Sequence, residues 1–395
     1  MARNAESRAV DVVTPDLSGF FLSLALLVRI GAFIMINFVV FTGELEHPDS
    51  LYYHERATEL IRGEGSAGVA EYLANKGGYV VFVAGAYQLL GQHPFVLALV
   101  NVLCGAGTVV LGYRLARHVF DIDTARIAGF MLALDPALVY WSTQLLKDTL
   151  VTFLAFAAVY LVLGKRRLQL QGGVELTVVI LVLASLRPEV AFASVIALSF
   201  FGLRSRGRPG AALILALVGV GVFAFTTASS WWEAYGGRGV ESGESVVQFV
   251  ENVRVGSDVE SHVAFYQGTL SGGEFGSTTD LLATVAKSPL YFLFVPYIWQ
   301  ARSTWELLYV VPGLWWYLVG ILGTYGIVKA FGNRRARNLS WLVLLLGLPI
   351  VILFTAPAAI VRWRLPSAAL LVPFAAYGVR ALRFRDRRRA EARVV

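Results

Sequence analysis

Long apolar runs separated by short polar segments recur along almost the whole chain. A membrane-spanning helix needs about 20 apolar residues, and the runs lie at 17–42, 95–116, 125–142, 149–164, 173–187, 188–203, 210–229, 305–331, 339–357 and 365–382. Only 15% of the 395 residues are charged and 56% are hydrophobic, which is too little charge to cover a soluble surface of this size. The pattern therefore predicts an all-α, polytopic transmembrane helix bundle with about ten spans.

Basic residues cluster between the runs and give the bundle an orientation. The clusters contain Arg114, Arg117 and Arg126, followed by basic residues within 165–167, 204–208, 334–337 and 383–389. All of them fall on one side if the N-terminus is inside and the short stretch 78–91 is a re-entrant or interfacial helix. Because cytoplasmic loops carry an excess of Lys and Arg, both ends are predicted to be cytoplasmic, in a plasma (inner) membrane. The net charge of +7 then indicates contact with anionic membrane lipids and no nucleic acid.

Two polar stretches divide the chain into three predicted parts. Residues 1–228 form a transmembrane core, whose first outer loop, 43–94, contains an amphipathic helix at 50–62 that is expected to lie on the membrane. Residues 229–303 form an outer-face loop or cap, and residues 304–395 form the C-terminal transmembrane helices with a basic cytoplasmic tail. The break at Arg187-Pro188, between two short apolar runs, predicts helices that meet around a polar cavity.

Two acidic residues stand at the outer ends of predicted spans. Asp49 follows the first span, and Asp148 precedes the run 149–164. A carboxylate at a membrane mouth can act as a general base toward a hydroxyl or amine, whereas a solvated loop acid is the plainer interpretation of Asp49 alone. The Lys147-Asp148 pair enters an apolar run, where an unpaired charge costs about 2.5–3.5 kcal/mol at the centre of a span, which favours a functional role over a structural ion pair. Two such carboxylates predict either shared acid–base chemistry or a divalent metal site.

Cationic residues are predicted on the same outer face. Lys76, Arg187, Arg362 and Arg364 all fall at outer ends of apolar segments. A guanidinium binds phosphate oxygens in a bidentate fashion, so these residues are predicted to meet a lipid phosphate. The alternative is that the side chains reach out to lipid headgroups. This alternative suits Arg364 better than Arg187, since Arg187 lies beside a buried proline.

Other polar residues are given structural interpretations. Asp121-Ile-Asp123 has the spacing of a metal–nucleotide-sugar site but lies in a short inner loop beside arginines. Arg29 and Asp135 lie within spans and are predicted to neutralise each other. The five histidines show no metal-binding spacing, so His47 and His54 are predicted to be solvated loop histidines, with a metal ligand as the alternative. The single cysteine excludes an internal disulfide.

The order of these residues resembles the GT-C superfamily of integral-membrane glycosyltransferases. The likeness is to the branch of dolichyl-phosphate-mannose protein mannosyltransferases and bacterial aminoarabinose transferases, and it covers about residues 15–200 well and the last sixty residues loosely. The segments that carry it are Asp49-Ser-Leu-Tyr52, Lys76-Gly-Gly-Tyr79, Asn101 to Gly105, Tyr113-Arg-Leu-Ala-Arg117, Leu134-Asp-Pro136, Leu145-Leu-Lys-Asp148, Arg187-Pro-Glu189 and Arg362-Trp-Arg-Leu-Pro366.

This resemblance implies sugar transfer from a polyprenyl-phosphate donor to a glycan, lipid or protein acceptor at the extracytoplasmic face. It implies catalytic roles for Asp49 and Asp148. It implies donor or lipid-phosphate binding by Tyr52, Lys76, Lys147, Arg187, Arg362 and Arg364. Ser50 stands where many members carry a second acid, so no cofactor is certain and a divalent metal, Mg or Mn, is left open.

Two other functions fit parts of the pattern. An O-antigen ligase or polymerase that uses a diphosphate-linked glycan also has many spans and one large outer loop, but its key basic and His residues are expected within that loop. A lipid-linked sugar flippase or transporter is expected to show internal repeats, and no repeat is visible. The outer-face position of the candidate residues favours the transferase.

Overall fold

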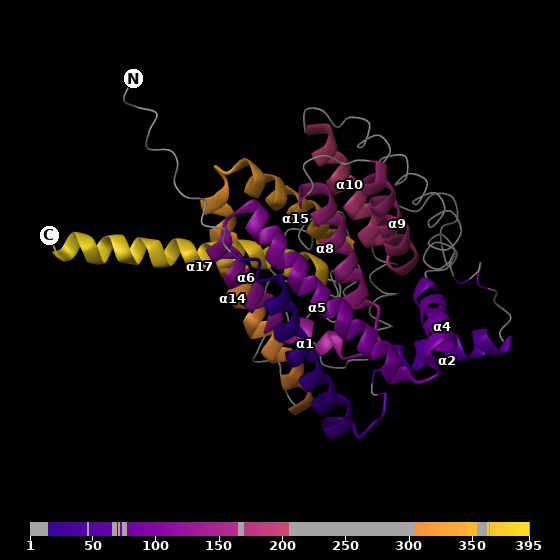
Figure 1. Ribbon diagram of the computed structural model, residues 1–395. Coiled ribbons are helices and arrows are strands. Elements are labelled where there is room, and N and C mark those ends of the chain that lie inside the picture. Colours follow the sequence, from indigo (N-terminus) through magenta and orange to yellow (C-terminus); the bar gives the residue numbers. More distant parts are fainter. Residues whose placement is uncertain are drawn as a thin grey trace, which may run out of the picture.

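The computed structural model describes residues 15–45, 47–64, 69, 72, 77–164, 170–204, 304–353, 362 and 364–394. Within these ranges the regular elements are all helices (Figure 1). Several sequence predictions lie outside the described residues: the span at 210–229, the cap at 229–303, Lys76, and the basic residues at 165–167, at 205–208 and, for their side chains, at 384–389. The predicted all-α bundle is confirmed in the described part.

Three described helices are long and apolar enough to cross a membrane. They are Ser18–Val40, Pro94–Val119 and Leu365–Arg383, while Gly78–Leu90, Asp148–Leu163 and Gly172–Leu186 are shorter apolar helices among the described residues. The first of these spans consists of α1 (Ser18–Ile34) and a π-helical end, η1 (Met35–Val40). The membrane character of the chain is thus confirmed, and the count of about ten spans stays a prediction.

The run 125–142, predicted as one span, is two helices in the structure. Helix α6 (Ile122–Ala133) ends before Asp135, and α7 (Pro136–Ser142) starts immediately after it. Pro136 has no backbone N–H to continue α6, and the Asp135 side chain accepts a hydrogen bond from the backbone N–H of Leu138 at the start of α7. An aspartate cap followed by proline is a strong helix start. The number of apolar residues in the run gives no sign of this break.

The other breaks agree with the sequence. The outer loop contains α2 (Pro48–Arg62) and α4 (Gly78–Leu90), which pack against each other. Helix α8 (Asp148–Gly164) is followed by α9 (Leu170–Leu186) and α10 (Pro188–Arg204), with the predicted break at Arg187. The C-terminal part contains α14 (Thr304–Ala330), α15 (Arg334–Leu353) and α17 (Leu365–Val394).

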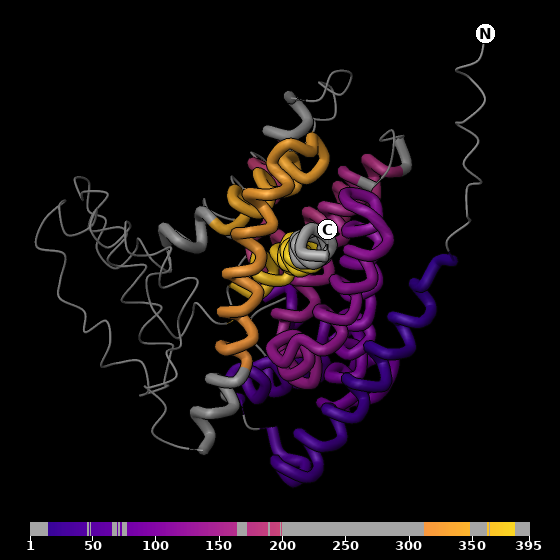
Figure 2. Tube along the Cα trace, turned by 90° about the vertical axis from the view of Figure 1, so that its left-hand side faces the viewer, coloured from indigo at the N-terminus to yellow at the C-terminus, as the bar shows by residue number. Residues whose placement is uncertain are grey.

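The first turns of α17 form the centre of the bundle. Helix α17 packs against α14, α6, α8, α5 (Pro94–Val119) and α15, and Figure 2 shows it end-on among them. Helices α14 and α17 approach closely at Gly326, where an added Cβ would lie 1.9 Å from the Phe374 carbonyl oxygen. Small residues allow this approach of helices in membranes. Because α17 starts in the core, Arg362, which lies three residues before its first residue, is held against the bundle with 18% of its side chain exposed.

Basic residues from distant segments meet at one end of the bundle. Arg117 lies 3.4 Å from Asp16, and Arg335 donates to the His118 carbonyl oxygen at 3.1 Å. Arg380 of α17 pairs with Asp121, which also caps α6. Arg114, Arg117 and Arg335 therefore lie together, as their predicted placement on one side requires. Asp121 has the structural role that the sequence indicated.

Candidate functional site

Four charged side chains from four separate segments converge at one place. Asp148, at the start of α8, pairs with Arg187 from the α9–α10 junction. The Arg362 guanidinium donates to the same Asp148 carboxylate through Nε at 3.1 Å and Nη2 at 2.9 Å. Its Nη1 donates to Asp49 Oδ2 at 2.5 Å. Both predicted carboxylates and two of the predicted arginines thus form one cluster, which we call the charge cluster: Asp49, Asp148, Arg187 and Arg362.

The four members differ sharply in exposure. The side chains of Arg187 and Asp148 are 3% and 1% exposed, that of Arg362 is 18% exposed, and that of Asp49 is 45% exposed. A buried ion pair needs both partners, because removing one leaves an uncompensated charge. Asp148 is therefore an internal anchor for two guanidinium groups, whereas Asp49 is the member that a molecule from outside can reach.

The N-terminus of α2 places Asp49. Pro48 occupies the first helical turn, and the Nδ1 atom of His47 accepts a hydrogen bond from the Asp49 backbone N–H at 3.2 Å. A side-chain acceptor at this position satisfies one of the free N–H groups of the first turn. The His47 ring also faces Trp141 edge-on, with ring centroids 6.2 Å apart. The prediction of a solvated His47 is therefore wrong, because the ring is a half-buried cap.

This cap requires a neutral histidine. Burial, together with the positive charge of Arg362, lowers the pKa of His47 from 6.5 to about 4. Protonation would also remove the Nδ1 acceptor from the cap. The ring is thus neutral around pH 7, with its proton on Nε2.

The His47 cap predicts a specific loss of stability in acid. In the unfolded chain His47 binds a proton near pH 6.5, and in the folded chain only near pH 4, so its contribution is present above pH 6.5 and is lost as the pH falls toward 4. Between pH 7.5 and 5 the loss is about 2 kcal/mol. We expect the melting temperature of wild type to fall more over this range than that of His47→Asn, which keeps an acceptor but does not titrate. Equal falls would contradict the assignment.

Aromatic rings surround Arg362. Its guanidinium lies over the Trp141 ring, 5.6 Å from the centroid, an arrangement that stabilises a cation. Tyr53 of α2 is buried, and its ring meets that of Tyr79 edge-on, with ring centroids 4.8 Å apart. Trp141 and Tyr53 were not among the sequence candidates. Their signal in the sequence is weak, because an aromatic residue in a membrane helix is common whatever its role.

Three other predicted site residues lie in different surroundings. Lys147 is partly buried and its charge acts on the adjacent Asp148. Tyr52 is 49% exposed, and its ring lies under Arg56 instead of in the cluster. Arg364 is buried and lies over the Trp316 ring at 5.1 Å.

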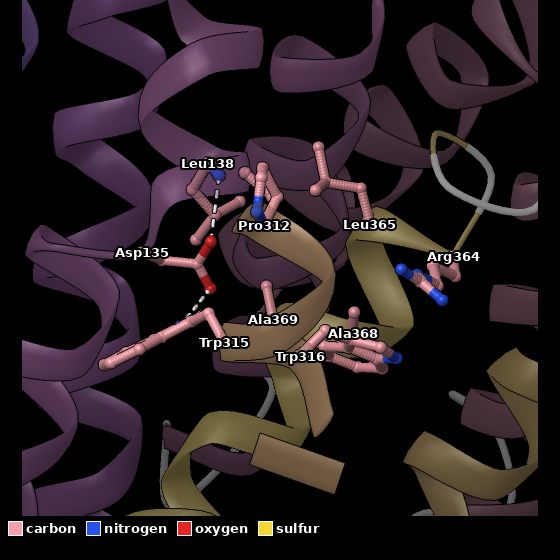
Figure 3. A pocket seen from close by; sticks show the side chains of 10 residues that line it. Asp135, Leu138, Pro312, Trp315, Trp316, Arg364, Leu365, Ala368 and Ala369 are labelled. Carbon is pink, nitrogen blue, oxygen red and sulfur yellow. Dashed lines mark hydrogen bonds between the residues drawn. The ribbon is translucent and has the colours of Figure 1, made fainter. Parts of the chain in front are cut away.

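Arg364 lines a small cavity between α7, α14 and α17. The other lining residues include Asp135, Trp315 and Trp316 (Figure 3). Asp135 accepts from Trp315 Nε1 at 3.0 Å as well as from the N–H of Leu138. The cavity volume is about 20 Å³, enough for one water-sized occupant. It is too small for a sugar or a phosphate.

The predicted Arg29–Asp135 pairing takes an indirect form. Arg29 is fully buried and donates to the carbonyl oxygens of Leu132 and Ala133 at 3.3 and 3.2 Å. These carbonyls belong to the last turn of α6, where helical partners are missing. The Arg29 charge also acts on Asp135, the next cap along the chain. Both residues thus stabilise the break between α6 and α7.

Metal binding was left open by the sequence. Among the residues that the structure describes, no group of three His, Cys, Asp or Glu side chains could hold a metal ion. Asp49 and Asp148, the carboxylates considered for a metal, both contact the guanidinium of Arg362.

A protein-family model matches part of the chain. The model of the family described as dolichyl-phosphate-mannose-protein mannosyltransferase matches residues 79–232. This range contains Asp148 and Arg187, whereas Asp49 and Arg362 lie outside it. A sequence search of the curated proteins found no match.

Comparison with solved structures shows the fold. The archaeal oligosaccharyltransferase AglB from Archaeoglobus fulgidus, in complex with an inhibitory peptide and a dolichol-phosphate, matches with a TM-score of 0.52 and 15% identity. The alignment covers 95% of this chain and 52% of AglB, so the chain spans about half the length of that protein. The apo form of the Archaeoglobus fulgidus enzyme gives a TM-score of 0.54 with 16% identity over 91% of this chain and 50% of that one.

A bacterial structure is also similar. ArnT from Cupriavidus metallidurans, bound to undecaprenyl phosphate, aligns over 91% of this chain and 77% of its own at 14% identity. Its TM-score is 0.41. The family match and the fold shared with AglB together confirm the resemblance of this chain to the GT-C superfamily of membrane glycosyltransferases.

Proposed function

We propose that this protein is a glycosyltransferase that moves a sugar from a polyprenyl-phosphate carrier to a hydroxyl or amine acceptor at the extracytoplasmic face of the plasma (inner) membrane. The observation that carries the proposal is the position of Arg362. Its guanidinium joins an exposed carboxylate, Asp49, to a buried one, Asp148, at a single site. A reactive base and a cation for a leaving phosphate are thereby within reach of one bound donor.

In the proposed reaction, Asp49 acts on the acceptor and Arg362 acts on the leaving phosphate. The Asp49 carboxylate takes the proton from the acceptor hydroxyl or amine, and the acceptor atom attacks the anomeric carbon of the sugar. The bond between that carbon and the phosphate oxygen breaks, and the polyprenyl phosphate leaves with the electron pair. The Arg362 guanidinium stabilises the negative charge that develops on the phosphate, because it is fixed in position before the reaction.

The buried members of the cluster support Arg362. Asp148 holds Arg187 and Arg362 side by side, so we assign it a positioning role through these two cations. Arg187 adds a second positive charge near the phosphate. Lys147 is proposed to add positive charge beside the cluster, and Lys76 is proposed to contact the donor phosphate. Tyr52 is proposed to bind another part of the donor, whereas Arg364, which lies over Trp316 beside a cavity too small for a sugar or a phosphate, is given no role at the donor.

The charge balance of the cluster favours a monophosphate donor. Two carboxylates oppose two guanidinium groups, so the charges of the four cluster members balance, and the adjacent Lys147 adds a positive charge. A diphosphate-linked glycan, the donor of the ligase alternative, would bring more negative charge to the same place. A flippase would need charged groups along a path to the opposite face, whereas this cluster lies where α2, α8 and α17 begin.

A donor panel tests the proposal. Purified protein in proteoliposomes is given radiolabelled sugars linked to polyprenyl monophosphate or to polyprenyl diphosphate, together with candidate glycan, lipid and peptide acceptors. We expect release of polyprenyl monophosphate and label transfer from at least one monophosphate donor. Transfer from diphosphate donors alone would favour the ligase. Movement of label across the bilayer without transfer would favour a flippase.

A further inference from the structure

The chain between α7 and α8 leaves the helical hydrogen-bond pattern within a buried part of the bundle. Thr143, Gln144, Leu145 and Leu146 are each at most 5% exposed, and Asp148 follows them at the start of α8. A backbone carbonyl without a partner is costly in such surroundings. The position of Asp148 therefore depends on what these carbonyl groups bind.

Two buried asparagines from other helices bind them. Asn101 of α5 is 0% exposed, and its Nδ2 donates to the Gln144 carbonyl oxygen at 2.7 Å and to the Leu146 carbonyl oxygen at 2.8 Å. Asn37 of η1 is 3% exposed, and its Nδ2 donates to the Thr143 carbonyl oxygen at 3.1 Å. An amide NH₂ has two donor hydrogens, and the Asn101 group uses both on this turn.

The asparagine contacts lie directly beside the charge cluster. Leu146, one of the two carbonyl partners of Asn101, is two residues from Asp148 in the chain. The Asn101 Nδ2 atom also lies 3.4 Å from the Tyr79 hydroxyl oxygen, and the Tyr79 ring meets edge-on that of Tyr53, four residues along α2 from Asp49. Asn101 thus contacts the turn that precedes Asp148 and the Tyr79 side chain that packs on Tyr53 of the Asp49 helix. It contacts neither carboxylate itself.

We propose that Asn101, together with Asn37, is a positioning residue that fixes Asp148 and, through it, Arg187 and Arg362 for binding the donor phosphate. This inference rests on the proposed function, since it concerns the same site. Without these donors the turn at 143–146 rearranges to satisfy its carbonyls. Asp148 then moves, and the two guanidinium groups lose the geometry that a phosphate needs.

A double-mutant cycle distinguishes positioning from a general role in folding. The probe is a polyprenyl monophosphate in detergent micelles, and binding is measured for wild type, Asn101→Ala, Asp148→Asn and the double variant. We expect Asn101→Ala to weaken binding about tenfold and to add little further weakening in the Asp148→Asn background, because both act through one group. Thr108→Val, a buried polar change on the same helix whose hydroxyl binds only its own helix, should leave binding unchanged.

The outcomes separate this inference from the proposed function. Absence of polyprenyl monophosphate binding by folded wild type overturns the proposed function and the inference with it. Binding by wild type that Asn101→Ala leaves unaltered, or that falls by equal factors in both backgrounds, overturns the inference alone. If Asn101→Ala does not fold, Asn37→Ala, which removes a single donor to the turn, goes through the same cycle with the same criteria.

Discussion

Replacing Asp49 with asparagine is expected to abolish sugar transfer and to strengthen the binding of polyprenyl monophosphate. Loss of a general base costs about 10²–10⁴-fold in rate, so turnover should fall by at least about 10²-fold. Binding should tighten about two- to fivefold, because the half-exposed pair of Asp49 with Arg362 is worth only a fraction of a kcal/mol to about 1 kcal/mol. The opposite signs of the two effects make the result specific.

The physical reason for the tighter binding is competition for one guanidinium. In the structure Arg362 Nη1 donates to Asp49, and a phosphate oxygen competes for the same donor. Asparagine presents no negative charge, so Arg362 is released for the phosphate. In wild type, the arrival of the donor phosphate would in the same way free the Asp49 carboxylate for the acceptor.

The control lies on the same helix. Glu59→Gln removes a carboxylate that pairs with Arg56 on the exposed face of α2, and both transfer and binding should stay at wild-type levels. Wild-type transfer by Asp49→Asn would contradict the assignment of the base. Weaker monophosphate binding by Asp49→Asn would contradict the competition.

Replacing Arg362 with glutamine is expected to remove most donor binding. The side chain makes three hydrogen bonds to the two carboxylates and is the cation proposed to meet the phosphate. Loss of charge-assisted hydrogen bonds to a ligand costs about 1.5–3 kcal/mol, which is about tenfold to more than a hundredfold in Kd. Asp148 keeps Arg187 as its partner, so the variant should still fold.

Two further variants define what Arg362 contributes. Arg362→Lys keeps the charge but cannot donate in a fork to two groups, so its Kd should lie between those of wild type and the glutamine variant. Arg126→Gln removes an exposed arginine that pairs with Asp123 and should have no effect. Donor binding by Arg362→Gln equal to wild type would show that the phosphate lies elsewhere.

The sequence predicted the class of fold correctly, and it predicted Asp49 and Asp148 on one face, where the structure brings both against Arg362. Apolar runs report the environment of a helix directly, and charges at the ends of such runs are few. The convergence of Asp49 with Asp148 followed from their placement on one face. The break between α6 and α7 did not follow, because an aspartate cap and a proline change the backbone without lowering the apolar content of the run.

Side-chain direction limits what the sequence could decide. Arg362 and Arg364 are two residues apart, yet the first meets both carboxylates and the second lies over Trp316 in a different cavity. Tyr52 was chosen on its place in the resemblance, whereas its neighbour Tyr53 is the one that points inward. One residue along a helix turns the side chain by about 100°. Whether Tyr52 or Tyr53 faces inward therefore becomes clear only once the packing of α2 is known.

The supporting residues were the least predictable. Asn37 and Asn101 act on backbone carbonyls of a turn far along the chain, and a carbonyl group carries no sequence signal. His47 was interpreted from its loop position, although its partner is the adjacent helix start. Such contacts depend on how segments that are distant in sequence come together.

A structure of the protein with a polyprenyl monophosphate bound would test the central claim most directly. We expect phosphate oxygens within hydrogen-bond distance of the Arg362 guanidinium, with Arg187 nearby and the contact between Arg362 and Asp49 broken. Asp148 should keep its contacts with both arginines. A phosphate bound away from Arg362, with the Asp49–Arg362 pair intact, would contradict the account.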